Sequence, residues 1–310
     1  MTLCTRKSRV SKEAGLLLGA LAFAANVCAQ TPSLAEYVYT PPSSWTVTRY
    51  PDGIVLSSPV SNTGEKCILS LWPMRPAGND LQRDAGNAFA EVFKAFEPRT
   101  SEYATPASMA RGVSADGWDY LIVKRAIGIP GQPTVSGFIF VARLGGWVAP
   151  VSGISKDPLV SSCFGLMVKD AWPKFFYSLR FRSWNPAAGA APLAARVPGA
   201  WMAVSASAGD RYVFAPNGRY ASAAAAQRYV RLSSTELLRV TDAYFGDGAY
   251  RLNGHQIVFT PDGKTGAENG LLRVEQESRD GGRTWADKLY LLRKSTVDGA
   301  EYEVAYTRQN

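Results

Sequence analysis

The chain has 310 residues, which is long for one small domain and typical of two. Hydrophobic residues make up 46% of it and charged residues 19%, so it can form a packed core and is not a disordered protein. The formal net charge is +8, but the basic residues are scattered and form no run with interleaved aromatic residues. The composition therefore predicts two folded domains and no nucleic-acid partner.

The first 29 residues have the pattern of a secretory signal peptide. A basic start precedes an apolar run over residues 14–27 that is too short to span a bilayer, and Val27-Cys28-Ala29 resembles a cleavage site. We predict cleavage after Ala29, a periplasmic or secreted location, and no transmembrane segment in the mature chain. A lipoprotein anchored through Cys28 is the alternative. Cleavage would remove four basic residues and one acidic residue, which lowers the net charge to about +5.

Two cysteines, Cys67 and Cys163, would remain after cleavage. An even pair in an exported chain predicts one disulfide, which would stabilise the fold by about 2 to 4 kcal/mol. Two buried free thiols are the alternative, because spacing in the sequence does not show that the two side chains meet.

Residues 30–184 are predicted to form an α+β sandwich domain with six strands and two helices. Turn signals such as Pro51-Asp52-Gly53 and Gly145-Gly146 separate strands that carry alternating apolar residues. The six expected strands are residues 46–50, 54–58, 66–72, 118–127, 135–143 and 147–154.

Apolar residues at helical spacing predict helices over residues 81–96 and 160–179. Asn79 or Asp80 would cap the first helix, and Pro173 would kink or restart the second. A loop rich in Ser, Thr and Ala is expected between the first helix and the strand at residue 118. This order of elements, together with Pro51-Asp52-Gly53 and Asp80-Leu81, resembles the PsbP-like family of α/β sandwiches.

Residues 185–198 are almost entirely Ala, Pro and Gly, which is typical of a linker between domains. Residues 199–310 follow, with regularly spaced turns and no clear helix, and predict an all-β antiparallel barrel of the up-and-down type. Residues 221–227 are rich in Ala and are interpreted as a strand or bulge, with a helical turn as the alternative. The turns are Asn217-Gly218, Asn253-Gly254, Asp280-Gly281-Gly282 and Asp298-Gly299.

The start and the end of this second domain carry a more specific signal. Gly199-Ala200-Trp201 resembles the Gly-x-Trp signature of the calycin superfamily, which includes lipocalins, fatty-acid-binding proteins and avidins. The resemblance implies a lipocalin-like barrel in which an Arg near the end of the last strand packs over the Trp and closes one end. Arg308 occupies that position, and it shares a strand face with Tyr302, Val304 and Tyr306. A guanidinium over an indole is attractive by about 0.5 to 2 kcal/mol.

Six aromatic residues of the barrel are the candidate ligand-binding residues. In a small barrel, the inward side chains either interlock as a solid core or line a pocket for one small ligand. Tyrosines favour the pocket, because an inward hydroxyl needs a partner. The candidates are Trp201, Tyr212, Phe214, Trp285, Tyr302 and Tyr306.

Catalytic and metal-binding patterns are weak. His255 is the only histidine and follows a turn, where an exposed or capping role is expected. One histidine and two cysteines do not make a zinc site, and no nucleophile elbow or phosphate-binding loop is present. Glu275 with Glu277, and Glu301 with Glu303, are same-face pairs that we assign to the wet side of the barrel wall.

The sequence therefore predicts an exported, non-catalytic binding protein without cofactor or metal. A small hydrophobic or amphipathic ligand would lie in the barrel. The alternative is a protein-interaction or scaffold module of the cell envelope, with a solid barrel and no ligand.

Overall fold

The computed structural model describes residues 34–60, 66–94, 108–127, 135–155, 171–184, 192–204, 208–231, 237–294 and 301–309. The segment predicted as a signal peptide, Cys28 and Cys163 lie outside these ranges, so export and the disulfide stay predictions. The described residues of Pro32–Asn310 form one compact unit. Within the described ranges, no helix is long and apolar enough to cross a membrane.

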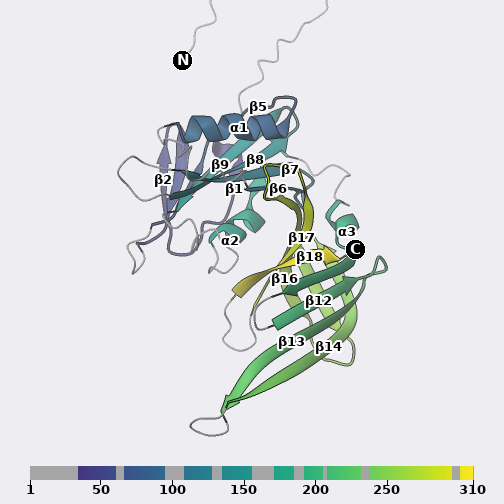
Figure 1. Cartoon of the computed structure of the whole chain (residues 1–310). Coiled ribbons are helices and arrows are strands. Elements are labelled where there is room, and N and C mark those ends of the chain that lie inside the picture. The colour runs from purple at the N-terminus through teal and green to yellow at the C-terminus, as the bar shows by residue number, and fades with distance from the viewer. Residues whose placement is uncertain are drawn as a thin grey trace, which may run out of the picture. The chain divides into compact units, whose positions relative to one another are not determined.

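The first half of the chain forms an antiparallel sheet in the order β6-β7-β8-β9-β4-β3-β2 (Figure 1). Two short strands, β1 (Tyr37–Val38) and β10 (Arg180–Phe181), pair separately, and β5 (Arg75–Pro76) pairs with β9. A single 3-10 turn, Leu34–Glu36, precedes β1. The strands of the main sheet are β2 (Thr46–Tyr50), β3 (Gly53–Ser57), β4 (Ile68–Leu71), β6 (Ser108–Val113), β7 (Asp119–Ile127), β8 (Val135–Leu144) and β9 (Trp147–Ser155).

Two helices cover opposite faces of this sheet. Helix α1 (Leu81–Val92) buries Ala85 and Ala88 in a cluster with Val123 and Ile139. Helix α2 (Ala171–Ser178) buries Phe175 and Phe176 in a separate cluster. Neighbouring strand residues point to opposite sides of the sheet, so the two clusters lie on opposite faces. Figure 1 shows one helix on each side of the strands. The finer assignment of this half to an α+β sandwich domain remains a prediction.

The first predicted helix begins at residue 81 as expected but ends at its C-cap Phe93, and residues 160–170 of the second predicted helix lie outside the described ranges. Asp80 is the N-cap of α1, and its Oδ1 accepts a hydrogen bond from the Gln82 amide at 2.9 Å. Pro173 is the third residue of the described part of α2, and the residues before Ala171 are not described, so a kink or restart at Pro173 stays a prediction. The expected loop before residue 118 was wrong, because it contains the paired strand β6.

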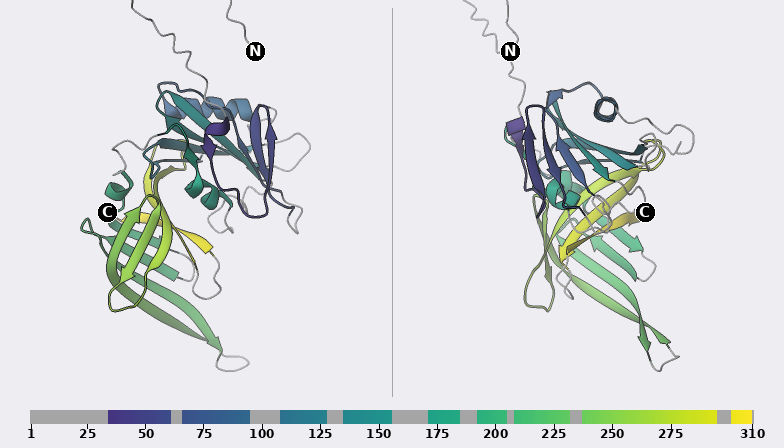
Figure 2. Two further views of the ribbon diagram at one scale, coloured as in Figure 1. Left: turned by 180° about the vertical axis from the view of Figure 1, so that it is seen from behind. Right: turned by 90° about the vertical axis from the view of Figure 1, so that its left-hand side faces the viewer.

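The second half is a closed barrel of eight antiparallel strands in chain order (Figure 2). Pairing of β11 with β18 joins the first and last strands, and pairing of β15 with β16 completes the wall. Gly218 and Gly254 have φ values of +81° and +61°, which the tight turns at these two positions require. The strands are β11 (Gly199–Val204), β12 (Ala208–Phe214), β13 (Arg219–Arg231), β14 (Leu237–Asn253), β15 (Gln256–Pro261), β16 (Glu268–Ser278), β17 (Ala286–Lys294) and β18 (Glu301–Gln309).

The Ala-rich residues 221–227 lie within the continuous strand β13, so the strand interpretation is confirmed. Part of the predicted linker is ordered, because Pro192–Arg196 forms a short helix, α3. Leu193 and Val197 are buried in the core cluster of the barrel. The division into two domains joined by residues 185–198 stays a prediction.

Strand β16 connects the barrel to the first sheet. One edge of β16 pairs first with β15, from Glu268 to Leu271, and then with β6, from Glu275 to Ser278. The sheet therefore continues from the barrel wall into the first half of the chain.

Candidate functional site

Trp201 and Arg308 lie together at the end of the barrel where the chain enters it. The two residues are register partners on β11 and β18, and the Arg308 Cζ is 4.7 Å from the centre of the indole. Trp201 is fully buried, and its Nε1 donates to the Val197 carbonyl at 2.8 Å. Arg308 Nη2 donates to the carbonyls of Arg196 and Pro198 at 2.8 and 2.9 Å. These bonds tie the last strand to the segment that leads into the first.

Beyond this end, aromatic rings pack against one another in the barrel interior. Tyr212 stacks on Phe214 with ring centres 5.5 Å apart and meets Tyr306 edge to face at the same distance. Phe214 also contacts Tyr250 at 5.0 Å, and Phe259 contacts Tyr212 at 5.8 Å. Such offset and edge contacts are preferred geometries for aromatic pairs. This part of the interior is a packed core.

A cavity of about 270 Å³ lies next to these rings. We call it the barrel cup, and its lining includes Asp210, Tyr212, Tyr220, Phe259, Glu268 and Arg293. Arg293 Nη2 lies 3.2 Å from Asp210 Oδ2, and Nη1 donates to the Tyr212 hydroxyl at 2.7 Å. Burial and the Glu268 carboxylate raise the pKa of Tyr220 to about 12, so its hydroxyl is neutral at physiological pH. The cup thus has aromatic walls and a charged rim.

The six predicted ligand residues separate in the structure. Trp201, Phe214 and Tyr306 belong to the packed core, and Tyr212 lines the cup. Trp285 packs instead beside Met109 and α1, outside the barrel interior. The side chain of Tyr302 is outside the described residues. Cys67 is buried, while its predicted partner Cys163 is not described.

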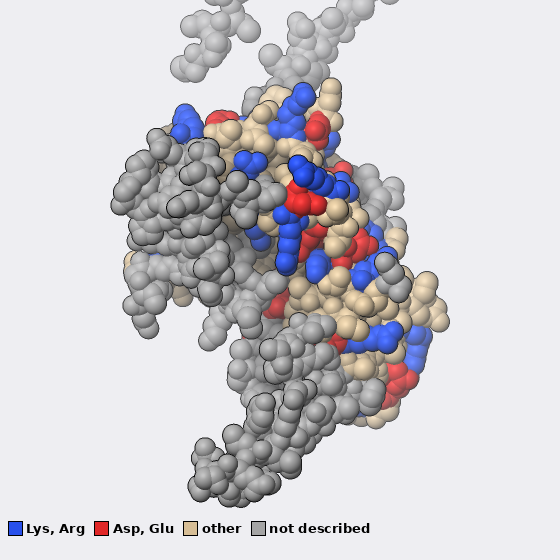
Figure 3. Space-filling view, in the orientation of Figure 1, with Lys and Arg blue, Asp and Glu red and all other residues tan. Residues whose placement is uncertain are grey.

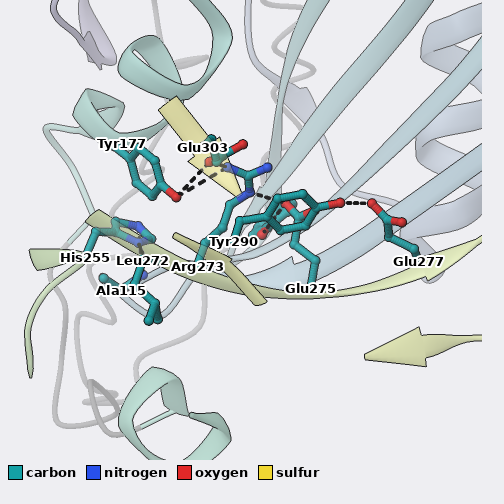
Figure 4. A network of polar contacts seen from close by, with 10 residues as sticks. Ala115, Tyr177, His255, Leu272, Arg273, Glu275, Glu277, Tyr290 and Glu303 are labelled. Carbon is teal, nitrogen blue, oxygen red and sulfur yellow. Dashed lines mark hydrogen bonds and ion pairs between the residues drawn. The ribbon is translucent and has the colours of Figure 1, made fainter. Parts of the chain in front are cut away.

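Figure 4 shows a network of polar side chains from β16 and neighbouring strands. It is buried, and it lies on the outer side of the barrel wall because Leu272 and Val274 of β16 point into the barrel. Arg273 of β16 is its centre, and its guanidinium pairs with Glu275 at 3.0 Å and with Glu303 of β18. The Arg273 Cζ also lies 4.0 Å from the ring centre of Tyr290. The Tyr290 hydroxyl donates a hydrogen bond to the Glu277 carboxylate. The assignment of Glu275 and Glu303 to a wet surface was wrong, because they are 2% and 8% exposed.

The first half of the chain covers this outer face. The Tyr120 hydroxyl of β7 donates to Glu275 Oε1 at 2.9 Å, and the Tyr177 hydroxyl of α2 donates to Glu303 Oε1 at 3.0 Å. Burial and the adjacent carboxylates raise the pKa of both tyrosines well above the ordinary value. Burial acts to lower the pKa of Arg273, but Glu303 and Glu275 raise it well above its usual value. The network therefore holds one cation and two anions in fixed bonds between the two halves.

His255 joins the two halves beside this network. It is 3% exposed, so the expected exposed position was wrong. Its Nε2 accepts from the Ala115 amide at 3.2 Å, which places the ring proton on Nδ1, and Nδ1 donates to the Leu272 carbonyl at 2.9 Å. Burial lowers the pKa of His255 to about 4, so the neutral ring is the form that fits.

Acid is expected to destabilise the fold through His255. The folded-state pKa of about 4 lies below the unfolded value of about 6.5. The stability that the neutral His255 ring contributes is therefore fully present above pH 6.5, and it is lost as the pH decreases toward 4. Between pH 7 and pH 5 we expect a loss of about 2 kcal/mol in the free energy of unfolding, measured by urea titration. His255→Gln should remove this component, because the chain has no other histidine. Equal pH slopes for the two proteins would contradict the assignment.

Among the described residues, no group of three or more His, Cys, Asp or Glu side chains is placed to hold a metal ion. On the face in view in Figure 3, basic and acidic side chains are intermingled.

A scan against protein-family models finds no match, and no curated protein matches this chain. The calycin and PsbP-like resemblances therefore rest on the residues and the element order given above.

Proposed function

We propose that this protein is an exported, non-catalytic binding protein that holds one small amphipathic molecule in the barrel cup. The observation that supports the proposal is the cavity of about 270 Å³ with aromatic walls and a charged rim. Small-ligand sites combine an apolar lining with a few polar groups that orient the ligand. The cup volume lies slightly below the usual range for such sites, about 300 to 1,000 Å³, so the ligand must be small.

The charges of the rim favour one orientation of the ligand. Lys264 and Arg293 face a larger set of carboxylates, and Asp210 already pairs with Arg293. An apolar ring would lie on Tyr220 and Phe259, and a cationic or hydrogen-bond-donating end would lie toward Glu268.

The alternative function is an interaction module with a solid barrel. The packed rings around Phe214 favour it, because their side chains occupy the barrel interior next to the cup.

Calorimetric titration with tryptamine, a small aromatic amine, separates the two functions. We expect saturable binding of one molecule by the wild-type protein. Ser222→Phe should abolish this binding, because Ser222 lines the cup and the ring would fill it. Ala221→Phe is the matched control, since the neighbouring Ala221 is exposed and is not among the cup-lining residues.

Native mass spectrometry of the purified protein adds a test for a natural ligand. The ligand proposal would fail if the protein carried no bound molecule and tryptamine did not bind. Equal binding by the Ser222→Phe and wild-type proteins would remove the cup as the site.

A further inference from the structure

A second cavity of about 500 Å³ lies outside the barrel, where α1, β6, β7 and the turn before β17 meet. We call it the arginine groove, and define it by Asp80, Arg111, Asp119, Arg143, Arg196 and Trp285. Its volume is within the range of small-molecule sites. None of its residues lines the barrel cup.

Trp285 and Arg111 form one wall of the groove. The Arg111 Cζ lies 4.1 Å from the centre of the Trp285 ring, so the guanidinium stacks on the indole. Arg111 Nε donates to Gln276 Oε1 at 3.0 Å, and Gln276 Nε2 donates to Asp287 Oδ1 at 3.0 Å. These contacts fix the guanidinium through Nε. Its Nη groups have no acceptor within the described part of the chain.

The turn between β16 and β17 holds Trp285 in place before any ligand binds. Asp280 accepts hydrogen bonds from the hydroxyl and amide of Thr284 and from the Ser278 hydroxyl, and these bonds hold the pKa of its carboxyl well below the usual range. Trp285 Nε1 donates to the Gly282 carbonyl at 3.0 Å. A pre-formed wall reduces the entropy lost when a ligand binds.

The uncommitted charges of the groove are mainly positive. Arg143 Nη2 lies 3.2 Å from Asp84 Oδ2, and the Asp80 carboxylate caps α1. Arg143 and Asp80 therefore already have partners. The guanidinium of Arg196 has neither an ion pair nor a hydrogen bond to any residue that the structure describes. Asp119 is the remaining carboxylate in the lining and is exposed. Two guanidinium groups, on Arg111 and Arg196, are therefore available to an anion.

We propose that the arginine groove binds a flat organic anion. The oxyanion of the ligand contacts Arg111 and Arg196, which donate charge-assisted hydrogen bonds. The flat body of the ligand packs against the apolar lining beside Trp285. This site is independent of the barrel cup, so either one can fail without the other.

Calorimetric titration of the full chain with 2-naphthoate tests the proposal, with neutral 2-naphthamide as the isosteric control. We expect saturable naphthoate binding and at least about tenfold weaker binding of the amide, because charge-assisted bonds are lost. Arg111→Gln and Arg196→Gln should each weaken naphthoate binding by about tenfold, and Trp285→Leu should also weaken it. Arg49→Gln is the matched control, since Arg49 is exposed on β2 and lies outside the groove.

Three results would overturn the proposal. The first is no saturable binding of naphthoate at millimolar concentration. The second is equal affinity for naphthoate and naphthamide. The third is wild-type affinity in both arginine variants of the groove. Loss of binding on Arg293→Gln together with intact binding in Arg111→Gln would assign the anion to the barrel cup instead.

Discussion

Replacement of Arg273 by Met is expected to lower the free energy of unfolding by about 3 to 5 kcal/mol, measured by urea titration. Arg273 is the cation between the buried carboxylates of Glu275 and Glu303, and its side chain is 7% exposed. Met fills much of the same volume, so the loss comes from two buried anions without a counter-charge. The hydroxyl groups of Tyr120 and Tyr177 would remain as hydrogen-bond donors to the two carboxylates.

The triple variant Arg273→Met, Glu275→Gln, Glu303→Gln is the compensating control. It removes the buried charges together, and the tyrosine hydroxyls can still donate to the amide oxygens, so we expect it to recover most of the lost stability. Arg293→Met is the matched single variant, because the side chains of Arg293 and its partner Asp210 are 26% and 23% exposed and the pair is more solvated than the Arg273 network. Its cost should be about 1 kcal/mol or less. An equal cost for Arg273→Met and Arg293→Met would contradict the role of the buried network.

Trp201→Ala is expected to cost about 3 to 5 kcal/mol, because it opens a large cavity at the closed end of the barrel. The indole is fully buried, donates to Val197 and lies beneath the Arg308 guanidinium. Urea titration of the variant measures the loss. A cost below about 1 kcal/mol would show that this end tolerates a void and would contradict the packing argument.

A double-mutant cycle with Arg308→Met separates packing from the cation–π contact. We expect a coupling free energy of about 0.5 to 2 kcal/mol between Trp201 and Arg308. Trp201→Phe keeps an aromatic ring but loses the Nε1 donor, so its cost should be lower than that of Trp201→Ala. Zero coupling would mean that Arg308 acts through its bonds to the carbonyls of Arg196 and Pro198 and its ion pair with Asp287, and not through the indole.

The sequence by itself determined the barrel. Each turn at Asn217-Gly218 and Asn253-Gly254 supplies a Gly that adopts positive φ, and alternation of apolar residues decides which face of a strand points inward. The same alternation places Trp201 and Arg308 on one face of the first and last strands. These signals are local or have a fixed period of two, so they can be read without knowing what surrounds each strand.

The tertiary structure alone decided what covers the outer face. Leu272 and Val274 point into the barrel, so Arg273 and Glu275 must point outward, but the sequence does not say whether outward means water or protein. Here the outer face meets Tyr120 and α2, which buries charges that the pattern assigns to solvent.

The same reason explains His255, β6 and Trp285. His255 follows a turn signal, but the turn is covered by the first half of the chain, so the ring is buried. The strand β6 becomes recognisable through its partners β7 and β16, which are distant in sequence. Trp285 lies outside the barrel interior, where it was predicted, because its turn lies against Met109 and Arg111. Periodicity reports that two faces of a strand differ, whereas contacts between distant segments decide whether the outer face is wet or dry.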